Sequence, residues 1–231
     1  MLSTKNVNIG GSGSLPKTLN PGNVKAKINS VVLEDHRFKE GGKQLILHIE
    51  TEEIGNGFEG FLIDKDNPEA GRYKGQIGRV RTSEYPYVTE ETRFGHVDRD
   101  AEILKAVKSL CSAVGANKWF DDQDEKHETI DEFIQAFNSD APFKDKWLDF
   151  CLCGREYTND AGYTNYDLFL PKFKKGLSPY EAFGTKDSKL IKFDESVHIK
   201  KKEVKPVEAF GDEPVNEIPK KKKSTSKDFE L

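Results

Sequence analysis

The sequence predicts a mainly β domain that carries a helical insertion, an α+β fold, between two disordered tails. Three observations support this prediction. Runs with alternating or aliphatic residues fill the chain from residue 24 to residue 82, apolar residues recur at helical spacing between residues 104 and 137, and strand-like runs return between residues 147 and 170. The order of elements is therefore strands, helices and a final hairpin.

The first part of the chain contains four extended runs. Val24–Leu33 alternates apolar residues with lysines, which predicts a strand with a cationic outer face. After a Gly-Gly turn signal, Leu45–Thr51 is rich in aliphatic residues and predicts a second strand. Gly57–Asp64 and the basic segment Tyr73–Thr82 are further extended runs.

Two helices are expected in the middle of the chain. Leu104–Val114 has apolar residues at helical spacing, Asp98 can cap its start and Gly115 can end it. A second helix opens with the capping box Thr129–Glu132 and carries apolar residues through Phe137.

A hairpin is expected at the end of the domain. Trp147–Tyr157 and Tyr163–Leu170 have strand composition and are separated by the turn signal Asn159–Gly162. This order matches an OB-fold-like five-stranded barrel with two helices between the third and fourth strands, provided that Phe58–Asp64 and Tyr73–Thr82 form one broken third strand. A generic mixed α+β domain is the alternative.

Composition divides the chain into three parts. Residues 1–22 contain glycine, serine and proline and predict a flexible N-terminal arm. Residues 23–199 form the predicted OB-fold-like nucleic-acid-binding domain, and residues 200–231 form a Lys/Glu-rich tail that is expected to be disordered. The 35% hydrophobic and 33% charged content is consistent with such tails.

The sequence predicts a cytoplasmic protein with reduced thiols. No run approaches the roughly 18 apolar residues that a membrane span needs, and the first residues lack the apolar region of a secretory signal. The odd number of cysteines predicts no disulfide framework, so Cys111, Cys151 and Cys153 are expected to be buried and reduced.

The segment Gly71–Tyr87 carries the strongest functional signal. Between Ala70 and Ser83 there are four cations and no acid, although the whole chain has a formal net charge of -4. Cations that neutralise phosphates, set among rings that stack on bases, are typical of a single-stranded nucleic-acid groove. A solvated basic edge strand is the alternative interpretation.

Fifteen residues are candidates for nucleic-acid binding. The cations of the basic strands are candidate phosphate contacts: Lys25, Lys27, Arg72, Lys74, Arg79 and Arg81. The rings of the same region are candidates for stacking on bases: Phe61, Tyr73, Tyr85 and Tyr87. For Phe61, a place in the core is the competing interpretation. The final hairpin supplies a second set: Arg155, Tyr157, Tyr163, Tyr166 and Lys172.

Five short motifs resemble bacteriophage single-stranded DNA-binding proteins. They are Pro21–Ile28, Leu45–Thr51, Gly75–Val80, Gly154–Tyr157 and Tyr166–Pro171. The resemblance extends from about residue 21 to residue 173. It implies an oligonucleotide-binding barrel that coats exposed DNA during replication and recombination, without sequence specificity, catalysis or a cofactor. It also implies the cytoplasm of the host cell as the location.

The resemblance further implies a tail that recruits replication or recombination proteins. Such tails are usually strongly acidic, whereas this chain carries nine lysines and seven acids from Lys200 onward. A tail of nearly balanced charge is not expected to displace DNA from a cationic groove, and Lys220–Lys223 can itself contact phosphates.

Two other classes of function are alternatives. A metal-dependent nuclease could use Glu50, Asp64 and Asp66, but the five histidines are scattered and no phosphate-binding loop is present. A calcium loop starting at Asp66 has Ile77 where the bidentate acid belongs. No catalytic or metal-binding residue is therefore assigned. A scaffolding protein that binds only protein partners is the second alternative.

Overall fold

The computed structural model describes residues 17–55, 57–158, 162–174 and 176–201. Within them it is a mainly β protein with a mixed sheet and four α-helices. The strands of the main sheet are β1 (Gly22–Asp35), β2 (Lys43–Thr51), β5 (Ile77–Arg81), β8 (Trp147–Thr158), β9 (Thr164–Phe169), β10 (Tyr180–Ala182) and β11 (Ile199–Lys200). Two small antiparallel sheets are β3 (Phe61–Leu62) with β4 (Arg72–Tyr73), and β6 (Glu90–Thr92) with β7 (Gly95–Val97).

The strand pairings of the main sheet return to their starting point. β1 pairs with β2, β2 with β5, β5 with β9, β9 with β8, and β8 again with β1. All these pairs are antiparallel except β5–β9, which is parallel. β10 and β11 add to β8 outside this cycle. The connection between β5 and β8 carries three helices between Arg99 and Asp140, where the sequence predicts two.

β1 can pair with two strands because it is long and irregular. Its first half, Gly22–Lys27, pairs with β8, and Ala26–Asp35 pairs with β2. The register shifts between Ile28 and Ser30, which marks a bulge at Asn29. A bulge bends a strand and increases its twist, so β1 can pass from one partner to the other.

The core lies between the strands and the helices. Alternation along the strands buries Ala26 and Ile28 of β1, Leu47 of β2 and Val80 of β5. From β8, Leu148, Phe150 and Leu152 join the same cluster. The helices add residues such as Val107 and Leu110 of α1 (Arg99–Val114), and Phe133 and Phe137 of α3 (Ile130–Asp140). One continuous cluster therefore ties both layers together.

The two expected helices are confirmed, with the expected caps. α1 spans Arg99–Val114, and the Asp98 side chain accepts a hydrogen bond from the Ala101 amide (2.9 Å). Gly115 ends α1 in the left-handed conformation, at φ 73°. α3 spans Ile130–Asp140, and its Thr129 hydroxyl accepts from the Glu132 amide (3.2 Å). These caps satisfy backbone groups that a helix end leaves unpaired.

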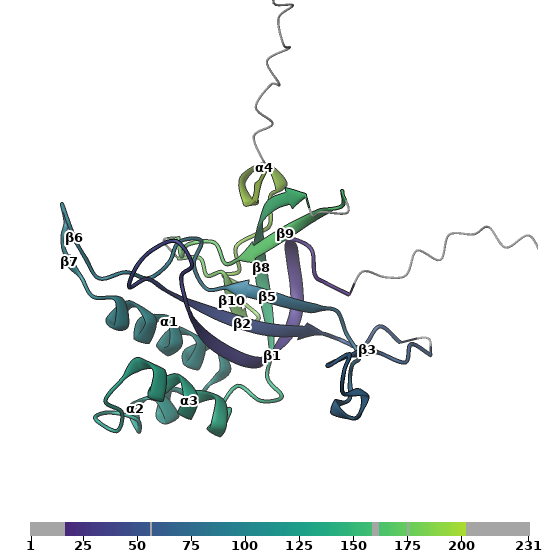
Figure 1. The fold of residues 1–231 in the computed structure, drawn as a ribbon, viewed down its shortest axis with the longest axis horizontal. Coiled ribbons are helices and arrows are strands. Elements are labelled where there is room, and N and C mark those ends of the chain that lie inside the picture. The colour runs from purple at the N-terminus through teal and green to yellow at the C-terminus, as the bar shows by residue number, and fades with distance from the viewer. Residues whose placement is uncertain (1–16, 56, 159–161, 175, 202–231) are drawn as a thin grey trace, which may run out of the picture.

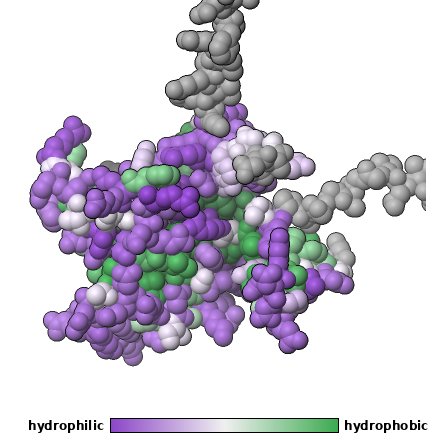
Figure 2. Space-filling model, in the orientation of Figure 1, coloured by the Kyte–Doolittle hydropathy of each residue, from purple (hydrophilic) through white to green (hydrophobic). Residues whose placement is uncertain are grey.

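Figure 1 places α1, α2 (Asn117–Asp121) and α3 together on one side of the strands, with the β6–β7 and β3–β4 hairpins projecting at opposite ends. α4 (Glu195–His198) lies by the β8–β9 hairpin, and η2 (Pro68–Ala70) lies between β3 and β4 in the chain. Figure 2 shows hydrophilic side chains over the helices and the β6–β7 hairpin, with hydrophobic surface between the helices and the sheet.

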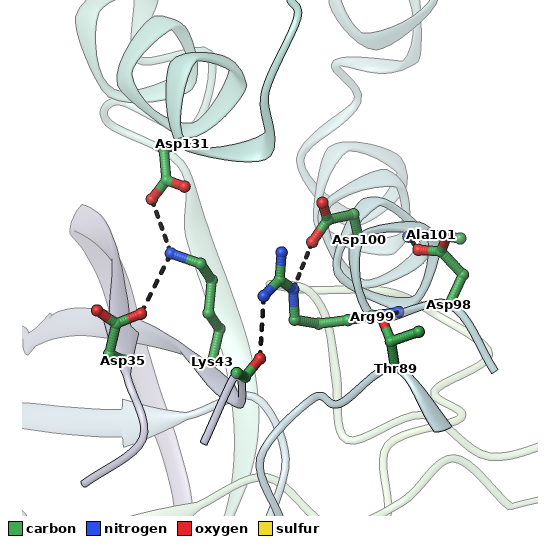
Figure 3. A network of polar contacts seen from close by, with 9 residues as sticks. Asp35, Lys43, Thr89, Asp98, Arg99, Asp100, Ala101 and Asp131 are labelled. Carbon is green, nitrogen blue, oxygen red and sulfur yellow. Dashed lines mark hydrogen bonds and ion pairs between the residues drawn. The ribbon is translucent and has the colours of Figure 1, made fainter. Parts of the chain in front are cut away.

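Polar side chains fasten the helical layer to the strands. Where β1 has left β8, Asn138 of α3 accepts from the Val31 amide (2.8 Å) and donates to the Val31 carbonyl (2.5 Å). At the other end of β1, Lys43 lies 3.4 Å from Asp35 and 3.2 Å from Asp131 of α3 (Figure 3). Beside it, Arg99 donates to the Gly41 carbonyl (2.9 Å).

The structure corrects the prediction for the third strand. Phe58–Asp64 and Tyr73–Thr82 do not form one broken strand, because β3 and β4 pair with each other and only β5 joins the main sheet. The chain reverses between β3 and β4 through Pro68–Ala70 and Gly71, whose φ is 96°, and it bends again at Lys74 and Gly75 before β5. β3 and β4 therefore form a separate hairpin within the connection between β2 and β5.

The domain extends slightly beyond the predicted boundaries of residues 23–199. Before β1, Thr18 forms a parallel bridge with Ile77, and the Leu19 amide donates to the Ile77 carbonyl (2.9 Å). At the other end, Lys200 pairs with Arg155 in the β11–β8 ladder. Most of the predicted arm and tail, residues 1–16 and 202–231, lies outside the described residues.

The three cysteines are free and buried, as expected. Burial raises the pKa of Cys111 to about 12 and that of Cys151 to about 11. These thiols are therefore protonated at neutral pH and serve as small apolar groups.

In the part of the chain that the structure describes, none of the helices has the length and apolar character that crossing a membrane requires.

Candidate nucleic-acid interface

The outer face of β1, β2 and β5 carries several of the cationic candidates. Because side chains alternate along a strand and directly paired residues share a face, the pairs Lys27–Glu50, His48–Arg79 and Ile46–Arg81 lie on the same side. The intervening residues, Leu47 and Val80 among them, point into the core. Lys27, Arg79 and Arg81 therefore project from one surface.

Arg79 lies in the middle of this face. Its Nη2 is 2.5 Å from Oε2 of Glu34, and the two side chains are 53% and 42% exposed. Exposed ion pairs contribute little net stability, so Arg79 can leave Glu34 for another anion at small cost. The neighbouring His48 has its pKa lowered by burial and, to a smaller extent, by Arg79, while Glu34 opposes the shift.

Arg81 lies where β5 meets β9. Its guanidinium carbon is 5.8 Å from the ring centre of Phe169, and Nη1 donates to the Glu84 carbonyl (3.4 Å). Nη2 is buried and makes no hydrogen bond within the described residues. Burial lowers the pKa of Arg81, and Asp167 opposes this shift.

Glu84 is the carboxylate around which the neighbouring cations gather. Its side chain is only 12% exposed, and its Oε1 accepts from Arg155 Nη2 (2.9 Å) and from Lys200 Nζ. Burial raises the pKa of Glu84, but the hydrogen bonds from Lys200 and Arg155 outweigh it and hold the pKa below its usual value. Glu84 is therefore ionised at neutral pH and fixes both cations.

An exposed ring lies directly beside this carboxylate. Tyr85 is 55% exposed, and the Nζ atoms of Lys172 and Lys200 lie 5.9 Å and 6.0 Å from its ring centre. These distances are within the range of cation–π contacts. We call this group the Glu84 patch, and its members are Arg81, Glu84, Tyr85, Arg155, Lys172 and Lys200. Four cations thus surround one carboxylate and one accessible ring.

The β8–β9 hairpin continues from the patch. Arg155 and Tyr157 are two residues apart on β8 and therefore share a face. Tyr157 is 43% exposed, and Tyr163, just before β9, is 70% exposed. Two accessible rings thus extend the surface beyond Arg155. Residues 159–161, at the turn of this hairpin, lie outside the described residues.

The basic segment itself is divided between two places. Arg79 and Arg81 belong to β5, whereas Arg72 lies on β4 and Lys74 follows it. Arg72 Nη1 donates to the Gly60 carbonyl (2.9 Å), and Lys74 Nζ donates to the Glu59 carbonyl (2.7 Å). Both cations thus brace the β3–β4 hairpin, so the structure does not align all four along one strand.

Lys25 and Lys27 lie on the outer face near the β1–β8 ladder, and both have acidic partners. Lys25 pairs with Glu52, and its Nζ is 3.6 Å from the ring centre of Phe183. Lys27 Nζ is 3.8 Å from Glu50. Their charges are therefore locally balanced, in contrast to those of the Glu84 patch.

The stacking candidates also differ in what they contact. Phe61 and Tyr73 are directly paired across β3 and β4, and the Phe61 ring lies 4.7 Å from that of Phe58 in a T-shaped contact. Tyr87 packs against the core, and its hydroxyl bonds to Thr82 Oγ1 (2.9 Å). Tyr166 also packs against the core. Tyr87 and Tyr166 thus do not offer a free ring face comparable to that of Tyr85.

Sequence reasoning missed two members of the patch. Lys200 was placed in the tail because the residues after it are rich in lysine, although it pairs with Arg155 in β11. Glu84 belongs to no recognisable sequence motif, and its role depends on contacts with residues more than 70 positions away. Only the position of Glu84, beside Tyr85 and directly after a basic strand, hinted at this site.

The residues of the nuclease alternative are engaged otherwise. Oε1 of Glu50 accepts from the Lys74 amide (2.9 Å) and the Gly75 amide (3.2 Å), and Glu50 is buried. Asp64 accepts from the Asp66 amide (2.9 Å) in a local turn. Among the described residues, no group of three histidine, cysteine, aspartate or glutamate side chains is arranged to hold a metal ion.

Comparison of the chain with protein-family models, with curated proteins and with solved structures finds no match.

Proposed function

We propose that this protein binds single-stranded DNA without sequence specificity, through an oligonucleotide-binding barrel whose outer face contacts the strand. Support for the barrel comes from the cycle of pairings β1–β2–β5–β9–β8–β1, with one parallel pair between β5 and β9. The helices α1, α2 and α3 lie between β5 and β8, at the position of the helical connection in this fold.

The Glu84 patch is the observation that carries the proposal. It combines four cations, one carboxylate and the exposed ring of Tyr85, and the exposed ring of Tyr157 adjoins it. A single strand offers both groups that such a surface fits, because its phosphates attract cations and its unpaired bases expose flat faces for stacking. In a duplex the bases are already stacked, so the rings would gain no partner.

Local charge favours this surface although the whole chain is acidic. The formal net charge of -4 includes acids spread over the helices and over residues 202–231, whereas phosphate attraction depends on the charges close to the binding surface. Arg79 extends the cationic surface from the patch along β5. Phosphates would replace Glu34 at Arg79 and share Arg155 and Lys200 with Glu84.

The direct test is a titration of fluorescent oligo(dT) and a matched duplex at two salt concentrations, in the presence of magnesium. The proposal expects the single strand to bind more tightly than the duplex. Salt should weaken this binding strongly, because binding releases counterions from the phosphates. The oligonucleotide should remain uncleaved. Equal binding to the duplex, or no binding, would contradict it, and cleavage of the strand would indicate the nuclease alternative.

A protein-binding role is the second candidate. It is favoured by a cavity of about 550 Å³ in the helical layer, with a floor that includes Phe120 and Phe133 and a rim that includes Asp121, Asp124 and Glu125. Under this alternative the oligonucleotide titration gives no signal.

We further propose, from the resemblance to phage proteins, a role in replication or recombination in the host cytoplasm. Any recruitment by the tail involves residues outside those described.

A further inference from the structure

A second cavity, of about 430 Å³, opens next to the Glu84 patch. It lies between α1, the segment 82–87 that follows β5, the segment 170–173 that follows β9, and β10. Lys172 belongs to both the patch and the cavity, and Thr82 and Ser83 connect Arg81 to its wall. The cavity is therefore continuous with the proposed binding surface.

Aromatic rings form much of its lining. Tyr87 and Tyr180 are half-buried or buried in the core, so they form a rigid floor. The hydrogen bond between the Tyr87 hydroxyl and Thr82 Oγ1 (2.9 Å) fixes the first of these rings, and burial fixes Tyr180. Phe173 meets Tyr180 in a T-shaped contact at 5.8 Å and is 56% exposed. One face of this ring is therefore accessible.

The polar groups of the cavity come from two lysines, one acid and several hydroxyls. Lys172 is exposed, while Lys105 of α1 lies 2.6 Å from Glu102, which is also part of the lining. The hydroxyls belong to Thr82, Ser83, Ser109, Tyr87 and Tyr180. Cavities of roughly 300–1,000 Å³ that are mostly apolar, with a few polar groups, are typical of sites for flat organic ligands.

We propose that this cavity receives one nucleobase of the DNA strand that crosses the Glu84 patch. The base stacks on the accessible face of Phe173, and its 5′ or 3′ phosphate lies at Lys172. This inference rests on the proposed function, and it adds a base-binding pocket to a surface otherwise made of cations and exposed rings. A base in a single strand enters such a pocket more easily than one in a duplex, because it has no pairing partner to lose.

The test combines photocrosslinking with one substitution in the full-length chain. Oligo(dT) in which 5-iododeoxyuridine replaces some thymidines is bound and irradiated, and the crosslinked peptides are identified by mass spectrometry. The proposal expects crosslinks to the peptide that contains Phe173 or Tyr180. In parallel, Phe173→Ala is expected to weaken oligo(dT) binding by roughly 5- to 150-fold, the range for loss of one stacked base.

The salt dependence separates the pocket from the phosphate contacts. Phe173→Ala removes no cation, so the slope of log affinity against log salt stays as in the wild type. The matched control is Phe94→Ala, because Phe94 is 85% exposed on the projecting β6–β7 hairpin and leaves the affinity unchanged. Circular dichroism of both variants checks that the fold is kept.

Each outcome decides one of the two claims. One outcome refutes the pocket while the proposed function stands. In it, the wild-type chain shows salt-sensitive binding, the crosslinks map only to Tyr85, Tyr157 or Tyr163, and Phe173→Ala binds like the wild type. If the wild-type chain binds no oligonucleotide under any salt condition, the proposed function fails first and the pocket with it.

Discussion

Arg155 and Glu84 form the contact that organises the candidate surface, with Nη2 and Oε1 separated by 2.9 Å. The two residues are 71 positions apart and belong to β8 and to the segment after β5. Lys200 binds the same carboxylate oxygen. A single buried acid therefore holds two cations at the place where three segments of the chain meet.

Replacing this acid is expected to strengthen DNA binding. In Glu84→Gln the carboxylate no longer competes with phosphates for Arg155 and Lys200. Because each additional phosphate contact changes the salt slope by about 0.7 for single strands, the slope should steepen by about 0.7 to 1.4. Fluorescence anisotropy with oligo(dT) at several salt concentrations measures both quantities.

The control for this substitution is Glu90→Gln, which removes an exposed acid from β6. It changes the net charge by the same amount but lies on the projecting hairpin. If Glu84→Gln binds oligo(dT) no more tightly than the wild type, Glu84 positions the cations and does not compete with DNA for them.

Stacking is expected to depend on Tyr85 and not on Tyr87. Tyr85→Leu removes an exposed ring from the Glu84 patch and should weaken oligo(dT) binding by about 1–3 kcal/mol, whereas Tyr85→Trp should retain binding. Tyr87→Phe removes only a hydroxyl that bonds to Thr82, so its affinity should match the wild type. Equal affinities of all three variants would exclude stacking on Tyr85.

The stability of the domain is expected to depend on Asn138. Its side chain pairs with both backbone groups of Val31, which have no strand partner on that side of β1. Leaving buried backbone groups unpaired costs about 1–3 kcal/mol, so Asn138→Ala should lower the urea midpoint. Asn165→Ala removes a single local bond to the Tyr163 carbonyl and serves as control. An unchanged midpoint for Asn138→Ala would show that water replaces these bonds.

Acidification is expected to destabilise the protein through His48. Burial and Arg79 lower its pKa below the ordinary value of 6.5, so the unfolded chain binds more protons than the folded chain as pH falls through that value. The free energy of unfolding should then decrease as pH falls from about 7.5 towards the lowered pKa. His198, whose pKa is also lowered by burial, acts in the same direction.

His48→Gln cannot take up this proton. Its free energy of unfolding, measured in urea at pH 7.5, 6.5 and 5.5, should therefore fall less than that of the wild type. The same pH slope in both proteins would assign the acid sensitivity to other groups, His198 first among them.

Local patterns were sufficient to predict most elements of the fold. The alternation in Val24–Leu33 and the caps at Asp98 and Thr129 depend on neighbouring residues, and the structure confirms the strand and both helices. The third strand was predicted wrongly because the chain reverses between Leu62 and Arg72, through η2 and Gly71, into a separate hairpin, β3–β4, that no local pattern distinguishes from one broken strand.

The site was harder to predict because it depends on long-range contacts. Arg79 and Arg81 were found as cations of a basic strand, and Tyr85 as a ring beside it. Which rings are free could not be read from the sequence, since Tyr85 and Tyr87 are two residues apart and only the second packs against the core. Lys200 became part of the site only through β11.

The most direct measurement of the central claim is the salt dependence of oligo(dT) affinity for two triple variants of equal charge. One is Arg79→Gln/Arg155→Gln/Lys172→Gln on the proposed surface, and the other is Arg93→Gln/Lys118→Gln/Lys126→Gln, whose residues are exposed on the β6–β7 hairpin and around α2. We predict that the first variant binds more weakly, with a salt slope shallower by about 2, and that the second follows the wild type. Indistinguishable behaviour of the two variants would contradict the assignment of DNA binding to this face.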